Sequence, residues 1–215
     1  MTGLAEEDNR ISGIVAQASL EKGDGVRPDL ERLANNRLVK GVRRILQGEK
    51  DNTYCLRPEF IEGVQSLPEF KLSFDICIYH FQMGGVIELV KKCPNVKFVL
   101  DHIGKPDIKN QLFEPWKADI KALAQFPNVW CKISGLVTEA DHANWSAAGL
   151  RPYIEHTIGQ FGFDRVMYGG DWPVARLAAE YLRWVEVLDE AVAGCSESEK
   201  RKLFRDNAIA FYLES

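Results

Sequence analysis

Two short segments place a side chain that can move a proton or bind a metal at the end of an apolar strand. In Val166–Val174, VMYGGDWPV, an apolar run leads through two glycines to Asp171. Pro173 cannot donate to a sheet ladder, so the strand ends there. Gly169 and Gly170 leave room beside the carboxylate for backbone or ligand. Barrels of the α/β class keep their chemistry at such strand ends, which favours a catalytic carboxylate; a turn aspartate that caps the next helix is the alternative.

The second segment is Phe98–Asp107, FVLDHIGKPD, in which a buried strand delivers Asp101 and His102 at its carboxyl end. Successive side chains of a strand point to opposite faces, so these two should not share a face. If His102 faces the barrel axis, we expect Asp101 to face the helices as a structural residue paired with Lys105. An imidazole and a carboxylate at two strand ends suit proton transfer, so His102 and Asp171 together favour a shared site over two structural polar groups.

Other polar or aromatic residues could complete such a site. Arg43 ends an apolar strand and could bind a substrate carboxylate or carbonyl, whereas Arg44 would point outward; an exposed charge without a role is the alternative for either. Lys132 and Ser134 share a strand face and could line the mouth, although a half-buried lysine stem would look the same. Trp172 could form the floor of the cleft or pack at the barrel rim.

Two further candidates for substrate binding lie close to strand ends. His80 follows an apolar strand, and Glu139 lies on the loop after the strand that carries Lys132, where a solvated loop carboxylate is the alternative. The remaining histidines, His142 and His156, are expected to be structural.

Short apolar runs alternate with amphipathic stretches, which is typical of βα units and a parallel sheet. The predicted strands are Ile11–Leu20, Val39–Leu46, Leu72–Ile78, Val96–His102, Val129–Leu136 and Arg165–Gly170. The predicted helices are Val26–Asn35, Pro58–Ser66, Gly84–Lys92, Phe113–Gln125, Leu150–Phe161, Ala178–Val192 and Glu197–Tyr212. A doubly wound sheet normally has a glycine-rich phosphate loop after its first strand, and SLEKGDG at 19–25 has no such pattern. An eight-stranded barrel that lacks two units fits the spacing of about 30 residues per unit.

The composition of the chain limits the classes of function that the protein can have. The 215 residues carry a formal net charge of −4, and no basic stripe indicates a nucleic acid or an anionic membrane as partner. No apolar run approaches the roughly 18 residues of a membrane span, and the polar, acidic amino terminus resembles no signal peptide. The five cysteines are scattered without a CxxC pair, which indicates a reducing compartment, with the cytoplasm as the default. Nothing divides residues 1–215 into more than one domain.

The chain resembles the amidohydrolase-related family of TIM-barrel metal-dependent hydrolases. The resemblance is carried by the segments that contain Asp171 and His102, together with KISGLVTEA at Lys132–Ala140 and GVRRIL at Gly41–Leu46. The resemblance runs over nearly the whole chain, to DNAIAFY at Asp206–Tyr212, and is strongest to the sugar-acid lactonases, such as fuconolactone and rhamnonolactone hydrolases. It implies that His102 is the strand-six histidine, which binds metal or polarises the substrate carbonyl. It implies that Asp171 is the strand-eight aspartate, which deprotonates the attacking water.

A divalent metal, zinc or manganese, could acidify that water and act as a Lewis acid, with His102 and Asp171 as an incomplete ligand set. Some lactonases of the family work without metal, so a site with no metal is the alternative. The family normally opens with an HxH pair on its first strand, and none occurs in these 215 residues. We therefore expect the six strands to be strands three to eight of a barrel whose amino-terminal part is missing.

The expected function is opening of a small sugar-acid or related lactone by water. A decarboxylase of the same superfamily, and an inactive remnant that only binds a metabolite or a partner, are the alternatives. The strands that should have paired with the missing ones would carry unpaired edges, and such edges invite association with a second copy of the chain.

Overall fold

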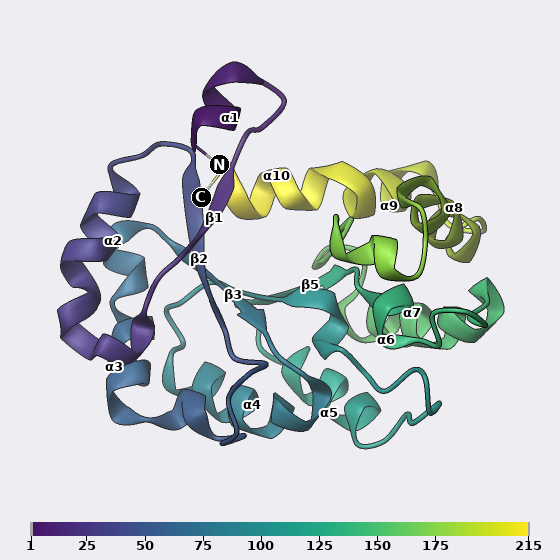
Figure 1. Cartoon of the computed structure of the whole chain (residues 1–215), viewed down its shortest axis with the longest axis horizontal. Helices are drawn as coiled ribbons and strands as arrows, with labels where there is room; N and C mark the ends of the chain where they lie inside the picture. The colour runs from purple at the N-terminus through teal and green to yellow at the C-terminus, as the bar shows by residue number, and fades with distance from the viewer. Residues whose placement is uncertain (1, 215) are drawn as a thin grey trace.

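The computed structural model describes residues 2–214, and its centre is one curved parallel sheet (Figure 1). Its strands are β1 Ile14–Gln17, β2 Val39–Ile45, β3 Ser73–Cys77, β4 Phe98–Leu100, β5 Val129–Ile133 and β6 Val166–Tyr168. They pair in the order β1-β2-β3-β4-β5-β6, each parallel to its neighbours. A doubly wound sheet would reverse this order at a switch point. The unbroken order is that of a barrel, and the predicted fold class, α/β with strands in the order of a TIM-type barrel, is confirmed. The numbering of these strands as three to eight stays a prediction.

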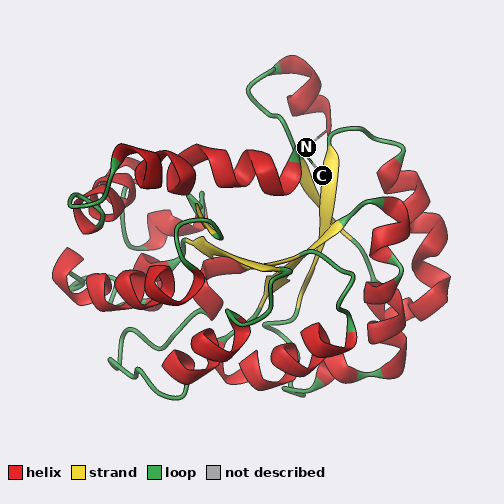
Figure 2. Cartoon of the chain, turned by 180° about the vertical axis from the view of Figure 1, so that it is seen from behind, coloured by secondary structure: helices red, strands yellow, loops and turns green. Residues whose placement is uncertain are grey.

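Helices between the strands cover the convex side of the sheet (Figure 2). The helices of the described residues, including α1 before β1 and α10 on the concave side, are α1 Thr2–Glu7, α2 Arg27–Ala34, α3 Pro58–Gln65, α4 Met83–Lys92, α5 Trp116–Leu123, α6 Leu136–Glu139, α7 Ala147–Phe161, α8 Tyr181–Ala191, α9 Glu197–Arg201 and α10 Asn207–Tyr212. Ser146 and Ser196 begin α7 and α9 by accepting hydrogen bonds from backbone N–H groups in the first turn. In the part of the chain described, no helix has the length and apolar character needed to cross a membrane.

The predicted elements are found, but several bounds were wrong. The predicted strand Ile11–Leu20 contains only four paired residues, because a 3₁₀ segment begins at Leu20. The predicted helix Glu197–Tyr212 is divided by a π-helical turn at Lys202–Asp206 into α9 and α10. Helical periodicity cannot reveal such a turn, because one extra residue per turn changes the face only locally.

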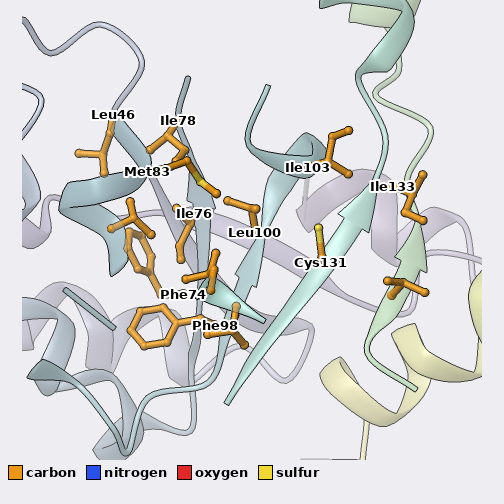
Figure 3. Packing of buried hydrophobic residues seen from close by; sticks show 14 of the residues in the cluster. Leu46, Phe74, Ile76, Ile78, Met83, Phe98, Leu100, Ile103, Cys131 and Ile133 are labelled. Carbon is orange, nitrogen blue, oxygen red and sulfur yellow. The ribbon is translucent and has the colours of Figure 1, made fainter. Parts of the chain in front are cut away.

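Side chains on the convex face of the sheet form the larger hydrophobic cluster. Phe74 and Ile76 of β3 and Phe98 and Leu100 of β4 are fully buried there, against the helices (Figure 3). The residues between them point to the concave side, as strand alternation requires. This core fixes which residues of each strand are left for the inside of the barrel.

The concave face has its own covering element, helix α10, which runs from α9 towards β1 across the open side of the sheet (Figure 1). Phe211 of α10 packs on Val99 of β4 and Met167 of β6 in a second, smaller cluster. Among the described residues, β1 pairs only with β2 and β6 only with β5, so the expected unpaired edges are present. A cavity of about 320 Å³ lies between β1 and α10, with Lys132 in its wall.

We predict that Gly63→Ala destabilises the fold, because a Cβ at this position of α3 would overlap the carbonyl oxygen of Leu20. The loss should be about 1–3 kcal/mol in the free energy of unfolding, as for overpacked sites, measured by urea denaturation. The matched control is Gly159→Ala in α7, where nothing lies within 4 Å of the new Cβ and alanine should gain about 0.5–1 kcal/mol. Equal stability of the two variants would contradict the close approach of α3 to Leu20.

Candidate active site at the strand ends

A cleft of about 680 Å³ lies at the carboxyl ends of the strands. Six of the residues predicted from sequence line it: Arg43, His102, Lys132, Ser134, Asp171 and Trp172. They come from the ends of β2, β4, β5 and β6 and the turns that follow, which is where a parallel barrel collects the groups that act on substrate.

The turns that carry the two central residues have unusual backbone conformations. After β4, His102 and Ile103 have positive φ angles of 56° and 48°, and Gly104 and Lys105 continue at 73° and 48°. After β6, Asp171 has a φ angle of 47°. Left-handed conformations are costly for residues other than glycine, and they persist where the surrounding structure fixes them.

The first turn corrects the prediction for Asp101. The strand ends at Leu100, so simple alternation no longer applies, and Asp101 and His102 both line the cleft. Asp101 does not pair with Lys105 towards the helices; it pairs with Lys132 and Arg43 inside the barrel. Asp101 is therefore a site residue that the sequence analysis missed.

His102 and Asp171 face one another across the cleft. His102 Nε2 lies 3.6 Å from Asp171 Oδ1, and their side chains are 11% and 9% exposed. On its other side, His102 Nδ1 shares a hydrogen bond of 2.8 Å with Ser134 Oγ. The hydroxyl of Thr138 donates to Asp171 Oδ2 at 3.4 Å. Gly135 is needed behind the ring, because a Cβ there would come within 2.9 Å of His102.

Burial lowers the pKa of His102 below its ordinary value, although the carboxylates of Asp101 and Asp171 act in the opposite direction. The imidazole is therefore neutral at neutral pH, with one nitrogen as donor and the other as acceptor. If Nδ1–H donates to Ser134, the lone pair of Nε2 points into the cleft towards Asp171.

Below this pair, a buried network of charges crosses the inside of the barrel. Lys132 Nζ lies 2.5 Å from Asp75 Oδ2 and 2.9 Å from Asp101 Oδ1, and these carboxylates are 0% and 1% exposed. Arg43 Nη1 donates to Asp101 Oδ2 at 3.1 Å, and the Tyr212 hydroxyl donates to Asp75 Oδ2 at 2.7 Å. The network thus joins β2, β3, β4 and β5 to the last turn of α10.

The pKa values of the network follow from burial and pairing. Burial raises the pKa of Asp75. For Asp101 burial acts in the same direction, but Lys132 and the other nearby cations outweigh it, so its pKa is lowered. Burial alone would lower the pKa of Lys132, but Asp75 and Asp101 outweigh burial and hold it well above its ordinary value. Lys132 is therefore a charged residue inside the barrel.

Two predicted site residues do not line the cleft. His80 Nδ1 donates to the backbone carbonyl of Lys105 at 3.0 Å, and Glu139 accepts from Lys105 Nζ at 2.9 Å. Both reach the cleft only through Lys105, which lines it and was not predicted as a site residue. Trp172 is 64% exposed, so it stands at the lip of the cleft and is neither its floor nor a packed rim residue.

Cys77 is buried, and its side chain also lines the cleft. It lies two residues after Asp75 on β3, and this spacing could have placed it on the inner face. Burial raises the pKa of its thiol to about 11, and the thiol donates to Gln47 Oε1 at 3.1 Å.

The residues around His102 form a candidate metal centre. Ligand atoms of Cys77, Asp101 and His102 lie within 4.8 Å of one another. Two ligands of one zinc ion stand about 3.4 Å apart when the bonds are near 2.1 Å and tetrahedral. The 3.6 Å between His102 Nε2 and Asp171 Oδ1 fits this spacing, so these two donors match the separation of two ligands of one divalent ion. Asp101 is less free than Asp171 because Lys132 and Arg43 already pair with it.

The fold and this cleft define a parallel α/β barrel with polar groups gathered at its strand ends, and comparison with known families identifies its class. A family model described as Amidohydrolase matches residues 3–213. The chain belongs to the amidohydrolase family.

Individual relatives are similar over nearly the whole chain. An uncharacterised protein of Sinorhizobium fredii is 34% identical over 99% of this chain and 73% of its own length. An L-fucono-1,5-lactonase of Burkholderia multivorans is 32% identical over 97% of this chain and 74% of its own length. The crystal structure of an amidohydrolase from Burkholderia multivorans with bound zinc has a TM-score of 0.88 and 30% identity, over 98% of this chain and 76% of that one.

We predict that Lys132→Met strongly destabilises the protein, because it leaves Asp75 and Asp101 buried without their shared cation. Removing one partner of a buried ion pair costs about 3–5 kcal/mol, which denaturant unfolding would measure. The control is Lys202→Met, whose ion pair with Asp164 is exposed and should contribute at most about 1 kcal/mol. A loss at position 132 no larger than at position 202 would be incompatible with a buried, charged Lys132.

A second prediction concerns the pH dependence of stability. Because the pKa of His102 is lowered in the folded state, the unfolded chain takes up a proton there first as the pH falls below about 6.5. The free energy of unfolding of the native chain should therefore fall more steeply between pH 7 and 5 than that of His102→Gln. Parallel curves for the native chain and His102→Gln would refute the prediction.

Proposed function

We propose that the cleft hydrolyses a small sugar-acid or related lactone, with Asp171 as the general base. The observation that carries the proposal is the 3.6 Å approach of His102 Nε2 and Asp171 Oδ1, from two strand ends, in one cleft. Family membership and relatives named L-fucono-1,5-lactonase and L-rhamnono-gamma-lactonase support this substrate class. Lactone opening is hydrolysis of a carboxylic ester, which requires one proton to leave water while negative charge develops on the carbonyl oxygen.

In this proposal, the carboxylate of Asp171 accepts the proton of the attacking water, and the Thr138 hydroxyl, which donates to the Gly135 carbonyl at 2.8 Å, lies beside it. His102 is neutral, and Ser134 fixes its ring. When Nδ1 accepts from the Ser134 hydroxyl, Nε2–H can polarise the substrate carbonyl, and when Nδ1–H donates to Ser134, the lone pair of Nε2 can serve as a ligand. Arg43 has a side chain that is 41% exposed, and a guanidinium has donors beyond the one that pairs with Asp101. We assign Arg43 to binding substrate oxygen atoms at the mouth.

A divalent metal would be held by His102 and Asp171, with Cys77 and Asp101 adjacent, and would supply acidified water and Lewis acidity when bound. Zinc and manganese are the candidates. The five cysteines are all free thiols, which supports action in a reducing compartment such as the cytoplasm. The unpaired edges of β1 and β6 support association with a second copy of the chain.

The test is a panel of sugar lactones assayed with the purified chain, with and without a chelator. We expect Asp171→Asn to lower kcat/KM by about 10²–10⁴-fold, since the base is lost while the shape is kept. The matched control is Asp164→Asn, an exposed carboxylate that pairs with Lys202 far from the cleft lining, and it should keep native activity.

Each alternative gives a different result in this assay. Release of carbon dioxide from an unsaturated or aromatic acid, without lactone turnover, would replace the proposal with a decarboxylase. Turnover that survives Asp171→Asn would remove Asp171 as the base. Loss of turnover in chelator, restored by zinc or manganese, would support the metal, whereas full activity in chelator would remove it.

A further inference from the structure

Two buried tryptophans contact the backbone of the two turns that carry His102 and Asp171. Trp116 Nε1 donates to the carbonyl oxygen of Ile103 at 2.7 Å. Trp184 Nε1 donates to the carbonyl oxygen of Gly169 at 2.8 Å. Ile103 directly follows His102, and both indole side chains are fully enclosed, with 1% exposure for each residue.

The tryptophans come from helices that lie behind the strand ends. Trp116 is the first residue of α5, and Trp184 lies in the first turn of α8. Neither lines the cleft, so neither can touch a substrate there. Their effect on chemistry can only pass through the turns that they hold.

The backbone of both turns is in an unfavourable conformation that needs stabilising contacts. His102 and Ile103 have positive φ angles, and Ile103 is β-branched, a side chain for which this conformation is especially unfavourable. Asp171 likewise has a positive φ angle. Such conformations persist only when contacts around them outweigh the strain, and a hydrogen bond from a rigid, buried ring fixes the carbonyl direction that defines the turn.

Simple packing does not explain these contacts. A phenyl ring would fill much of the same apolar space, but it has no N–H to satisfy a carbonyl at the end of a strand. A buried carbonyl without a donor is costly, so each indole both stabilises its turn and selects its orientation.

We propose that Trp116 and Trp184 are a pair of positioning residues that direct His102 and Asp171 into the same cleft. The inference rests on the proposed function of that cleft. Trp116 sets the direction of the imidazole, Trp184 sets the direction of the carboxylate, and the distance between His102 and Asp171 depends on both.

The chain contains a matched control. Trp145 Nε1 donates to the carbonyl oxygen of Ala178 at 2.8 Å, and neither Trp145 nor Ala178 lines the cleft. Trp145→Phe thus removes the same kind of hydrogen bond at a carbonyl seven residues after Asp171, and it leaves the bonds to Ile103 and Gly169 in place.

The experiment compares Trp116→Phe, Trp184→Phe and Trp145→Phe by lactone turnover, thermal unfolding and the NMR signals of the His102 ring nitrogens, assigned with His102→Gln. We expect the first two variants to lower kcat by about 10- to 100-fold with little change in KM, as for residues that orient reacting groups. Trp116→Phe should also shift the His102 ring-nitrogen signals. Trp145→Phe should lower the unfolding temperature and leave kcat and those signals unchanged.

A second variant at position 116 keeps the proposal testable if Trp116→Phe does not fold. Benzothienylalanine introduced at position 116 keeps the bicyclic shape and lacks only the N–H, and it should reproduce the loss of kcat and the shift of the His102 signals. Unchanged kcat and unchanged His102 signals in this variant would overturn the proposal and leave Trp116 as a packing residue.

The proposal can fail separately from the proposed function. If the native chain opens no lactone, that function fails, and the His102 ring-nitrogen signals alone decide the positioning role. A shift of the His102 signals in the Trp116 variant that is absent in Trp145→Phe then supports the positioning role. His102 signals identical to those of the native chain in the Trp116 variant overturn it.

Discussion

The ion pairs of Lys132 organise the inside of this barrel. Lys132 of β5 lies between Asp75 of β3 and Asp101 at the end of β4, and Asp101 continues the contact to Arg43 of β2. Charges in such a buried place are tolerated only when each is paired, because the cost of removing them from water is otherwise not offset. Four strands are thereby joined on the concave face by side chains, in addition to their backbone hydrogen bonds.

This network of ion pairs explains the backbone conformation of the turn that carries Asp101 and His102. Asp101 must face inward to meet Lys132 and Arg43, and in a continuing strand the next residue would then face the helices. The left-handed turn at His102 instead returns the imidazole to the side of Asp101. The unusual backbone is therefore what allows two consecutive residues, one structural and one facing the candidate substrate, to share one cleft.

The order of the strands and the proximity of His102 and Asp171 could be predicted from the sequence because both depend on local patterns. Apolar runs before Asp171 and His102 are long enough to specify strands, and the carboxyl ends of parallel strands meet at one edge. Asp101 was placed wrongly because alternation was extended two residues past the real end of β4. His80 and Glu139 were predicted for the cleft, but their contact is with Lys105, a long-range relation that no spacing in the sequence encodes.

Lys132 also has a place that its ion pairs alone do not describe. Its side chain lies in the wall of both the cleft at the strand ends and the smaller cavity between β1 and α10. Lys132 thus lies between the cleft that carries the candidate catalytic residues and the cavity beside α10. A shorter side chain at this position would leave less protein between the two cavities.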